Sequence, residues 1–386
     1  MKYDFDKIIG REGTDNIKLE AGVKINPYLP KEYIPLWVAD MDFACAPAIL
    51  DAMRARLDRR ILGYTDLGTE TKGSVVRWME RHFGWFPQED EIVFSAGIVA
   101  ALYAAVGRLT GPGDEVCFLT PAYQPFDKAV RLQGRVPLYS RMIERDAHWT
   151  IDFDDLQKKL SRPECRLFLH CDPQNPTGRV FAEAELRKIG ELCFTNGVFV
   201  VSDEIHEDLL RTGQTHIPLA KLFPKERRII TCTSPSKSFN IAGNNHAHLF
   251  IPDPQLKRDW TMRYYNGHPS ALSSNAVVAA YGKSEDWLEE LRSYLDGSFL
   301  MMSNFIGERM PKAKFAIPEG TYLAWVDLSG YGLSEQELKQ RISGAGVFVQ
   351  FGEDFVDNAD CHMRVNIACP RSVLTEGLDR ICRALE

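Results

Sequence analysis

Short apolar runs alternate with helical patterns along much of this chain. Each run has the length of a buried strand and ends in a polar or glycine-containing turn; the runs are 91–94, 115–119, 166–169, 198–201 and 228–232. Between them lie helical segments such as 182–196, which opens with acidic residues and ends at Gly197. Strands that alternate with helices at this spacing predict an α/β fold, with a mostly parallel sheet and helices on both of its faces.

The pattern changes near residue 284. A single long amphipathic helix is predicted for 287–310, followed by strands at 321–328, 347–351 and 363–368, with a helix at 334–343. These elements predict a small α+β domain over 286–386, beside a large domain over 46–285. Residues 1–45 contain Pro27, Pro30 and Pro35, and we expect them to form an extended arm that joins the small domain.

The composition argues against several classes of protein. The 386 residues carry a net charge of −7 without a dense block of Lys and Arg, so we expect neither nucleic acid nor a membrane as a partner. No apolar run reaches the roughly 20 residues of a membrane span. Nine cysteines without a C-x-x-C pair favour reduced thiols and a cytoplasmic location. His246 and His248 lack clustered cysteine or acidic partners, so we expect no metal there.

A lysine follows the last of the five apolar runs. Ligands in open α/β sheets bind outside the carboxyl ends of the strands, and the run 228–232 leads directly to Ser234, Ser236 and Lys237. A lysine amine that is removed from water can lose its proton and form an imine with an aldehyde. The two serine hydroxyl groups can hydrogen-bond a phosphate. These properties together indicate an aldehyde cofactor that also has a phosphate group.

Three further strand ends have candidate ligand-binding residues, and each has a plain structural interpretation as well. Residues 95–98 lead into a helix whose N-terminus could bind an anion, or they form an ordinary strand-to-helix turn. Tyr123 could stack on a flat cofactor or belong to the core. Asn175, held extended by Pro176, could hydrogen-bond a phenolic oxygen or simply form a turn.

Two charged residues stand in otherwise apolar strands. Asp203 follows the run 198–201, where a carboxylate is costly unless a cation meets it, either a protonated pyridine nitrogen or a nearby basic residue. His206 either supports Asp203 or packs in the core. Arg364 could bind the α-carboxylate of an amino acid, or it could be structural. With Lys237, these residues indicate pyridoxal 5′-phosphate (PLP) as the cofactor.

The order and spacing of these residues resemble fold type I PLP enzymes. More narrowly, the chain resembles the MalY/PatB cystathionine β-lyase (C-S lyase) group of the class I/II aminotransferase superfamily. The resemblance covers nearly the whole chain and rests on Pro-Leu-Trp-Val-Ala-Asp-Met-Asp-Phe (35–43), Gly-Tyr-Thr (63–65), Asn-Pro-Thr-Gly (175–178), Ser-Asp-Glu-Ile-His (202–206), Ser-Lys-Ser-Phe-Asn-Ile-Ala-Gly (236–243), Glu-Gly-Thr-Tyr-Leu (319–323) and Arg-Val-Asn-Ile-Ala-Cys-Pro-Arg (364–371).

The resemblance implies a role for each candidate. Lys237 would form the imine with PLP, and Asp203, with His206 beside it, would pair with the pyridine nitrogen. Arg364 would hold the substrate carboxylate, with Asp40 as a second substrate-binding residue. Tyr64 would reach the phosphate in the neighbouring subunit, so that a homodimer forms the active site. The remaining cofactor-binding residues would be Asn175 at the ring hydroxyl, Tyr123 on the ring face, and Ala96, Gly97, Ile98, Ser234 and Ser236 around the phosphate.

The chain departs from the family pattern near the cofactor. The departures are at 244–246 (Asn-Asn-His), 172–175 (Asp-Pro-Gln-Asn) and 95–98 (Ser-Ala-Gly-Ile), and they bear on substrate choice while leaving each proposed catalytic group in place. Asn245 also occupies a position at which transaminases of the superfamily often have an arginine. This difference favours a lyase over a transaminase.

We therefore predict a PLP-dependent carbon–sulfur β-lyase that cleaves L-cystathionine or a related cysteine S-conjugate to a thiol, pyruvate and ammonia. We expect it to act in amino-acid metabolism, in methionine biosynthesis. The freed amine of Lys237 would remove the Cα proton, and the protonated ring nitrogen opposite Asp203 would stabilise the resulting carbanion. Two alternatives stay open. One is an aminotransferase of the same fold, and the other is a regulatory role with a protein partner, as in some members of the group.

Overall fold

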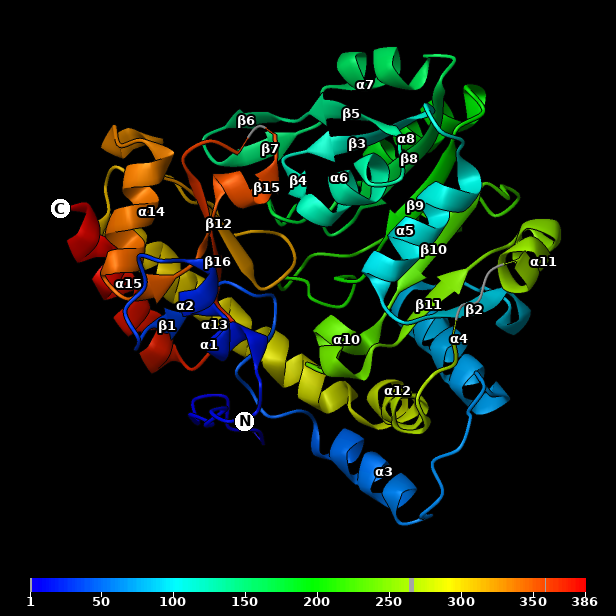
Figure 1. The fold of residues 1–386 in the computed structure, drawn as a ribbon, viewed down its shortest axis with the longest axis horizontal. Coiled ribbons are helices and arrows are strands. Elements are labelled where there is room, and N and C mark those ends of the chain that lie inside the picture. The colour runs from blue at the N-terminus through cyan, green and yellow to red at the C-terminus, as the bar shows by residue number, and fades with distance from the viewer. Residues whose placement is uncertain (1, 264–266, 358) are drawn as a thin grey trace.

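The computed structural model describes residues 2–263, 267–357 and 359–386, and its main feature is a seven-stranded sheet (Figure 1). Strand β11 runs antiparallel to both of its neighbours, whereas the other adjacent strands are parallel. The predicted α/β fold with a mostly parallel sheet is thereby confirmed. In sheet order, the strands are β2 (Ile92–Ser95), β11 (Ala247–Phe250), β10 (Ile229–Thr233), β9 (Phe199–Asp203), β8 (Cys165–Cys171), β3 (Glu115–Thr120) and β5 (Val136–Arg141).

Helices cover both faces of this sheet because successive side chains of a strand point to opposite faces. In β3, Phe118 belongs to one hydrophobic cluster, and its neighbours Cys117 and Leu119 belong to another. The first cluster includes α5 (Ile98–Leu109), α6 (Gln124–Arg131) and α11 (Pro254–Arg263), and the second includes α7 (Phe153–Leu160), α8 (Glu183–Thr195) and α9 (Leu219–Leu222).

The C-terminal part is built on a three-stranded antiparallel sheet with the order β12-β16-β14. Its strands are β12 (Leu323–Asp327), β16 (His362–Asn366) and β14 (Gln350–Phe351), and its helices are α13 (Glu285–Arg309), α14 (Glu335–Gly344) and α15 (Arg371–Leu385). The predicted long helix is α13. The helix predicted for 334–343 is α14, and the side chains of Ser334 and Glu337 form its N-terminal capping box.

Two predictions about extended segments were wrong in detail. The strand predicted for 347–351 is divided at Val349, because β13 (Val347–Phe348) pairs with β1 (Ile34–Pro35) while β14 pairs with β16. The arm is not extended throughout, since α1 (Ile17–Glu20) and α2 (Gly22–Ile25) precede the prolines, and Asn16 caps α1 by accepting a hydrogen bond from Leu19 N. The β1–β13 pair attaches the arm to the C-terminal part.

The remaining elements connect these two parts. Helix α12 (Ala271–Lys283) packs on α3 (Pro47–Leu57) and α4 (Thr69–Phe83) at the lower edge of Figure 1. Strand β4 (Ala122–Tyr123) pairs with β15 (Phe355–Val356), and β6 (Ile143–Arg145) forms a hairpin with β7 (His148–Thr150). The short helix α10 (Pro235–Ser238) follows β10. Within the described ranges, no helix has the length and apolar character needed to cross a bilayer.

The turn after β8 depends on Gly178. Its backbone is in the left-handed region at φ +70°, and a Cβ atom added there would lie 2.3 Å from Pro318 Cβ. We expect Gly178→Ala to lower the free energy of unfolding by about 3 kcal/mol, because left-handed strain of about 1–2 kcal/mol adds to the cost of overlap.

Gly197→Ala is the matched control for Gly178→Ala. Gly197 has a similar φ of +74°, but a Cβ atom there would meet nothing within 4 Å, so only the strain of about 1–2 kcal/mol should remain. Urea unfolding followed by circular dichroism measures both variants. Equal losses would show that the contact with Pro318 is unimportant.

Candidate functional site

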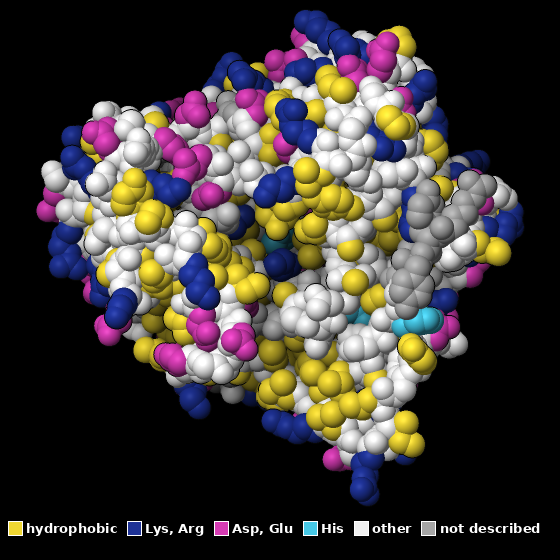
Figure 2. Space-filling model, in the orientation of Figure 1, with side chains coloured by type: hydrophobic (Ala, Val, Ile, Leu, Met, Phe, Trp, Pro, Cys, Tyr) yellow, Lys and Arg dark blue, Asp and Glu magenta, His cyan; other side chains and the backbone are white. Residues whose placement is uncertain are grey.

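A cavity of about 450 Å³ lies at the carboxyl ends of the parallel strands, where the large sheet meets the C-terminal sheet. The face shown in Figure 2 is hollowed near its centre. The volume is typical of a small-molecule site. The lining residues are Trp37, Val38, Ala39, Ala96, Gly97, Ile98, Val99, Ala100, Leu102, Tyr123, Cys171, Asn175, Asp203, Ile205, His206, Ser236, Lys237, Asn245, Gln350 and Arg364.

Lys237 reaches this cavity from α10. Ser234 caps the helix, because its Oγ accepts a hydrogen bond from Ser236 N at 3.1 Å and donates one to His246 O at 2.6 Å. Lys237 Nζ donates to Ala39 O at 2.7 Å. Burial lowers the pKa of Lys237 to about 8, although Asp40 and Asp203 oppose this change. About a tenth of the amine is therefore neutral at pH 7, far more than for an ordinary lysine, and this neutral amine can act as a nucleophile or base.

Asp203 is the last residue of β9 and is buried at the wall of the cavity. Its Oδ1 accepts a hydrogen bond from Ile205 N at 3.2 Å, and burial raises the pKa of Asp203 to about 7. A cationic group in the cavity would lower this pKa again, because an opposite charge favours the ionised carboxylate. Asp203 is thus suited to bind a protonated nitrogen of a ligand.

His206 and Cys171 lie beside Asp203. Burial, together with the charges of Lys237 and Arg364, lowers the pKa of His206 to about 3, so its ring is neutral at neutral pH. Its Nδ1 has no hydrogen-bond partner among the described residues. Cys171 is opposite Asp203 in the register of β8 and β9, and burial raises the pKa of its thiol well above the usual range. Sequence reasoning missed Cys171, although its position at a strand end was a usable signal.

Arg364 enters the cavity from β16 and is only 2% exposed. Its Nη1 donates to Asn175 Oδ1 at 2.7 Å, and its Nη2 donates to Trp37 O at 3.1 Å and to the side-chain oxygen of Gln350. Burial lowers the pKa of Arg364 to about 10, which leaves the guanidinium charged at neutral pH. Gln350 was also missed by sequence reasoning, although it is a polar residue within an apolar run.

Another part of the cavity wall is formed by the start of α5 and by Tyr123. Gly97 precedes α5 with φ 143°, a backbone conformation that favours glycine, and Ala96 and Ile98 flank it in the lining. The first backbone N–H groups of a helix lack partners within the helix and attract anions. Burial raises the pKa of Tyr123, so its phenol stays protonated. This wall combines an anion-binding helix end with an aromatic ring.

Three predicted site residues lie outside the lining of the cavity. Tyr64 is 99% exposed in the segment between α3 and α4. Ser234 is buried in its capping role, and the carboxylate of Asp40 accepts a hydrogen bond from Arg11 Nη2. Their proposed roles toward the cofactor and substrate stay predictions. The structure brings the other predicted residues to one cavity, together with Trp37, Val38 and Ala39 of the arm.

His246 and His248, the two histidines considered as metal ligands in the sequence analysis, lie next to each other, and His246 contacts a serine hydroxyl group. His246 precedes β11 and lies 2.9 Å through Nδ1 from Ser273 Oγ, and the ring centroids of His246 and His248 are 4.9 Å apart. Burial lowers the pKa of both rings. His246 contributes to the site through its backbone. Its carbonyl oxygen accepts the hydrogen bond from Ser234 Oγ, and Ser234 caps the helix that contains Lys237.

Comparisons with known proteins agree with this geometry. The sequence profile of the family described as aminotransferase class I and II matches residues 31–381. The chain is 40% identical to cystathionine beta-lyase PatB of Bacillus subtilis, over 99% of this chain and 100% of that protein, and 30% identical to protein MalY of Escherichia coli, over 99% of both. A solved PLP-bound C-S lyase from Staphylococcus hominis, in complex with L-cycloserine, aligns with a TM-score of 0.96 and 40% identity over 100% of this chain and 98% of that chain.

The pKa of Lys237 is testable by chemical labelling of the protein without ligand. Because burial lowers the pKa to about 8, the rate of reaction with an amine-directed reagent should rise about tenfold per pH unit below pH 8 and level off above it. An ordinary exposed lysine amine, with a pKa of about 10.4, should continue to gain reactivity. Mass spectrometry of the labelled peptides measures both rates. A Lys237 profile that keeps rising beyond pH 9 would contradict the lowered pKa.

Proposed function

Because the chain belongs to the class I and II aminotransferase family, we propose that it is a PLP-dependent carbon–sulfur β-lyase. The proposed substrate is L-cystathionine or a related cysteine S-conjugate, and the products are a thiol, pyruvate and ammonia. The observation that carries this proposal is the convergence of Lys237, Asp203 and Arg364 on one cavity. The 40% identity to a protein named as a cystathionine beta-lyase supports the choice of substrate class.

The residues of the cavity fit PLP. Lys237 has an amine of lowered pKa for the aldehyde, and Asp203 is a buried carboxylate of raised pKa for the pyridine nitrogen. The start of α5, with Ala96, Gly97 and Ile98, would hold the phosphate together with Ser236. Asn175 would bond the ring hydroxyl, and Tyr123 would cover a face of the ring. When bound, PLP supplies an electron sink for the carbanion formed at the substrate Cα.

The other steps follow from the side chains of this protein. The guanidinium of Arg364 binds and orients the substrate carboxylate, since its planar fork matches two carboxylate oxygens. The neutral amine of Lys237 takes the proton from the substrate Cα. The Cβ–S bond then breaks, the electron pair leaves with sulfur, and the thiolate takes up a proton. The remaining three-carbon enamine hydrolyses to pyruvate and ammonia.

A homodimer forms part of this proposal. In the segment between α3 and α4, the side chains of Ile61, Leu62 and Tyr64 are 75%, 57% and 99% exposed. Figure 2 shows hydrophobic side chains gathered in the lower part of the molecule. Burial of such apolar surface against a second copy would be favourable. It would also allow Tyr64 to reach the phosphate site of the partner subunit.

We place the enzyme in a reducing compartment, the cytoplasm, because its nine cysteines are free thiols.

The lyase activity is tested with purified holoenzyme and L-cystathionine. Pyruvate and free thiol should appear in equal amounts, and Lys237→Ala should abolish both while the protein remains folded. Amino transfer that needs a keto acid and releases no thiol would identify an aminotransferase instead. A normal cofactor spectrum that no amino acid changes would favour the regulatory role with a protein partner.

The role of Asp203 is tested by Asp203→Asn, which keeps the size of the side chain and removes its charge. Loss of the carboxylate beside the ring nitrogen should lower kcat for pyruvate formation by about 100-fold or more, because electrostatic stabilisation of developing charge is lost. PLP should remain covalently attached through Lys237. The matched control is Asp127→Asn, on α6 outside the cavity, where the Asp127–Arg131 pair is lost and kcat should stay within about twofold. Equal kcat values for the two variants would exclude the role of Asp203.

The contribution of Tyr64 is tested by mixing two inactive variants. Tyr64→Ala and Lys237→Ala subunits should each have little activity alone. In a randomly mixed dimer population, about one quarter of the active sites would combine an intact Lys237 with the partner's intact tyrosine. Activity near that fraction of wild type is expected after co-refolding. Absence of recovery would place Tyr64 in the active site of its own subunit, and full activity of Tyr64→Ala alone would place Tyr64 outside the active site.

A further inference from the structure

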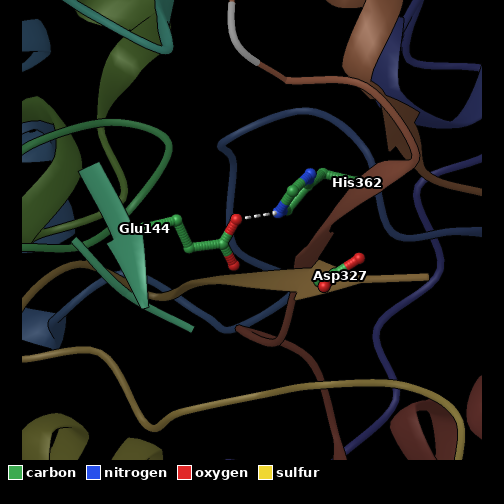
Figure 3. A group of neighbouring side chains, drawn as sticks. All are labelled: Glu144, Asp327 and His362. Carbon is green, nitrogen blue, oxygen red and sulfur yellow. Dashed lines mark ion pairs between the residues drawn. The ribbon is translucent and has the colours of Figure 1, made fainter. Parts of the chain in front are cut away.

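Three potential metal ligands meet where the β6–β7 hairpin lies against the C-terminal sheet (Figure 3). Glu144 is on β6, Asp327 ends β12 and His362 begins β16. Asp327 and His362 are opposite each other in the antiparallel β12–β16 pair. Each side chain places one ligand atom within 4.8 Å of the ligand atoms of the other two. These described residues are absent from the lining of the 450 Å³ cavity, so the group is separate from the proposed active site.

The ring of His362 is held in one orientation. Its Nδ1 lies 2.9 Å from Asp360 O, and a carbonyl oxygen can only accept, so Nδ1 bears a proton. The ring also stacks on Trp325, with centroids 5.0 Å apart and planes 12° apart, and lies 5.7 Å from the ring of Trp149. In the neutral ring, Nε2 must therefore present a lone pair. A histidine whose Nδ1–H is bound by a carbonyl is a typical metal ligand through Nε2.

The lone pair of His362 Nε2 faces a carboxylate. Nε2 lies 3.4 Å from Glu144 Oε2, and it forms no hydrogen bond within the described residues although His362 is only 6% exposed. Two electron-rich atoms this close repel each other unless a cation lies between them, either a proton on Nε2 or a metal ion. In an approximately tetrahedral zinc site with bonds of about 2.0–2.1 Å, ligand atoms lie roughly 3.3 Å apart. The observed separation matches this spacing.

The carboxylate of Asp327 can provide the third metal ligand. Its Oδ1 accepts a hydrogen bond from Ser329 N at 2.7 Å, whereas Lys314 Nζ is 3.6 Å from Oδ2, beyond hydrogen-bond range. The Lys314 side chain is 57% exposed and can move away into water. One imidazole and two carboxylates are a donor set suited to a divalent transition-metal ion, with water in the fourth position.

We propose that Glu144, Asp327 and His362 bind one divalent transition-metal ion, for which Zn²⁺ is the best match. The ion connects the β6–β7 hairpin to the C-terminal sheet, and its effect is to stabilise this contact. Such an ion binds the folded chain and raises its melting temperature by mass action. No sequence motif indicates this site, because its three ligands are far apart along the chain.

Equilibrium dialysis of chelator-treated holoenzyme against zinc chloride tests the proposal. Wild type should bind one Zn²⁺ per chain at this site, and Glu144→Gln and His362→Gln should bind it about tenfold more weakly or worse. The matched control is His148→Gln, which removes an exposed imidazole from the same hairpin and should leave the affinity unchanged. Zn²⁺ should raise the melting temperature of wild type and of His148→Gln, but not that of Glu144→Gln.

Two results would overturn the proposal. Failure of wild type to bind Zn²⁺ would show that Glu144 and His362 form only an ion pair. If Glu144→Gln bound Zn²⁺ as tightly as wild type, the ion would bind elsewhere, at a thiol or at the buried group Glu204, Glu207 and His216. Substitution with Co²⁺ gives an independent readout, because nitrogen and oxygen ligands should produce long-wavelength visible bands without the near-ultraviolet charge-transfer band of a cobalt–thiolate bond. That thiolate band would also contradict the proposed ligands.

Discussion

The hydrogen bond from Arg364 Nη1 to Asn175 Oδ1 joins the two parts of the molecule at the place where chemistry is proposed. Asn175 belongs to the turn after a strand of the large sheet, and Arg364 lies on a strand of the C-terminal sheet. Neither sheet alone could form the cavity. A buried guanidinium needs partners for its N–H groups, and here these partners come from both sheets and from the arm. These hydrogen bonds hold the C-terminal sheet in position next to the carboxyl ends of the parallel strands.

Burial then sets the protonation of the groups inside the cavity. It lowers the pKa of Lys237 and His206 and raises that of Asp203, because water no longer stabilises their charged forms. The result is an amine that is partly neutral, a neutral imidazole and a carboxyl group that a cationic ligand would ionise. The proposed lyase chemistry uses the neutral amine of Lys237 and the ionised carboxylate of Asp203. The fold therefore tunes the cavity through burial, and only secondarily through direct pairing of charges.

Several features of the site could be predicted from the sequence, and others could not. Asp203 ends a strand, and Asn175 and Lys237 come shortly after one, so the rule that ligands bind at carboxyl ends of strands places them together. Cys171 and Gln350 were missed although each left a local signal, a strand end for Cys171 and a polar residue in an apolar run for Gln350. Only the pairing between strands shows that both residues reach the cavity. The division of 347–351 into β13 and β14 has the same cause, since its two halves pair with different partners.

The sequence by itself determined the α/β class, the order of the elements and the chemical types available at the strand ends, because hydrophobic periodicity and residue chemistry are local properties. Only the tertiary structure decided which strand runs antiparallel, how Arg364 meets Asn175, and that Glu144, Asp327 and His362 come together. These outcomes depend on contacts between segments that are distant in sequence. Such contacts form when buried polar groups and apolar faces find partners in three dimensions, and no local pattern encodes that choice.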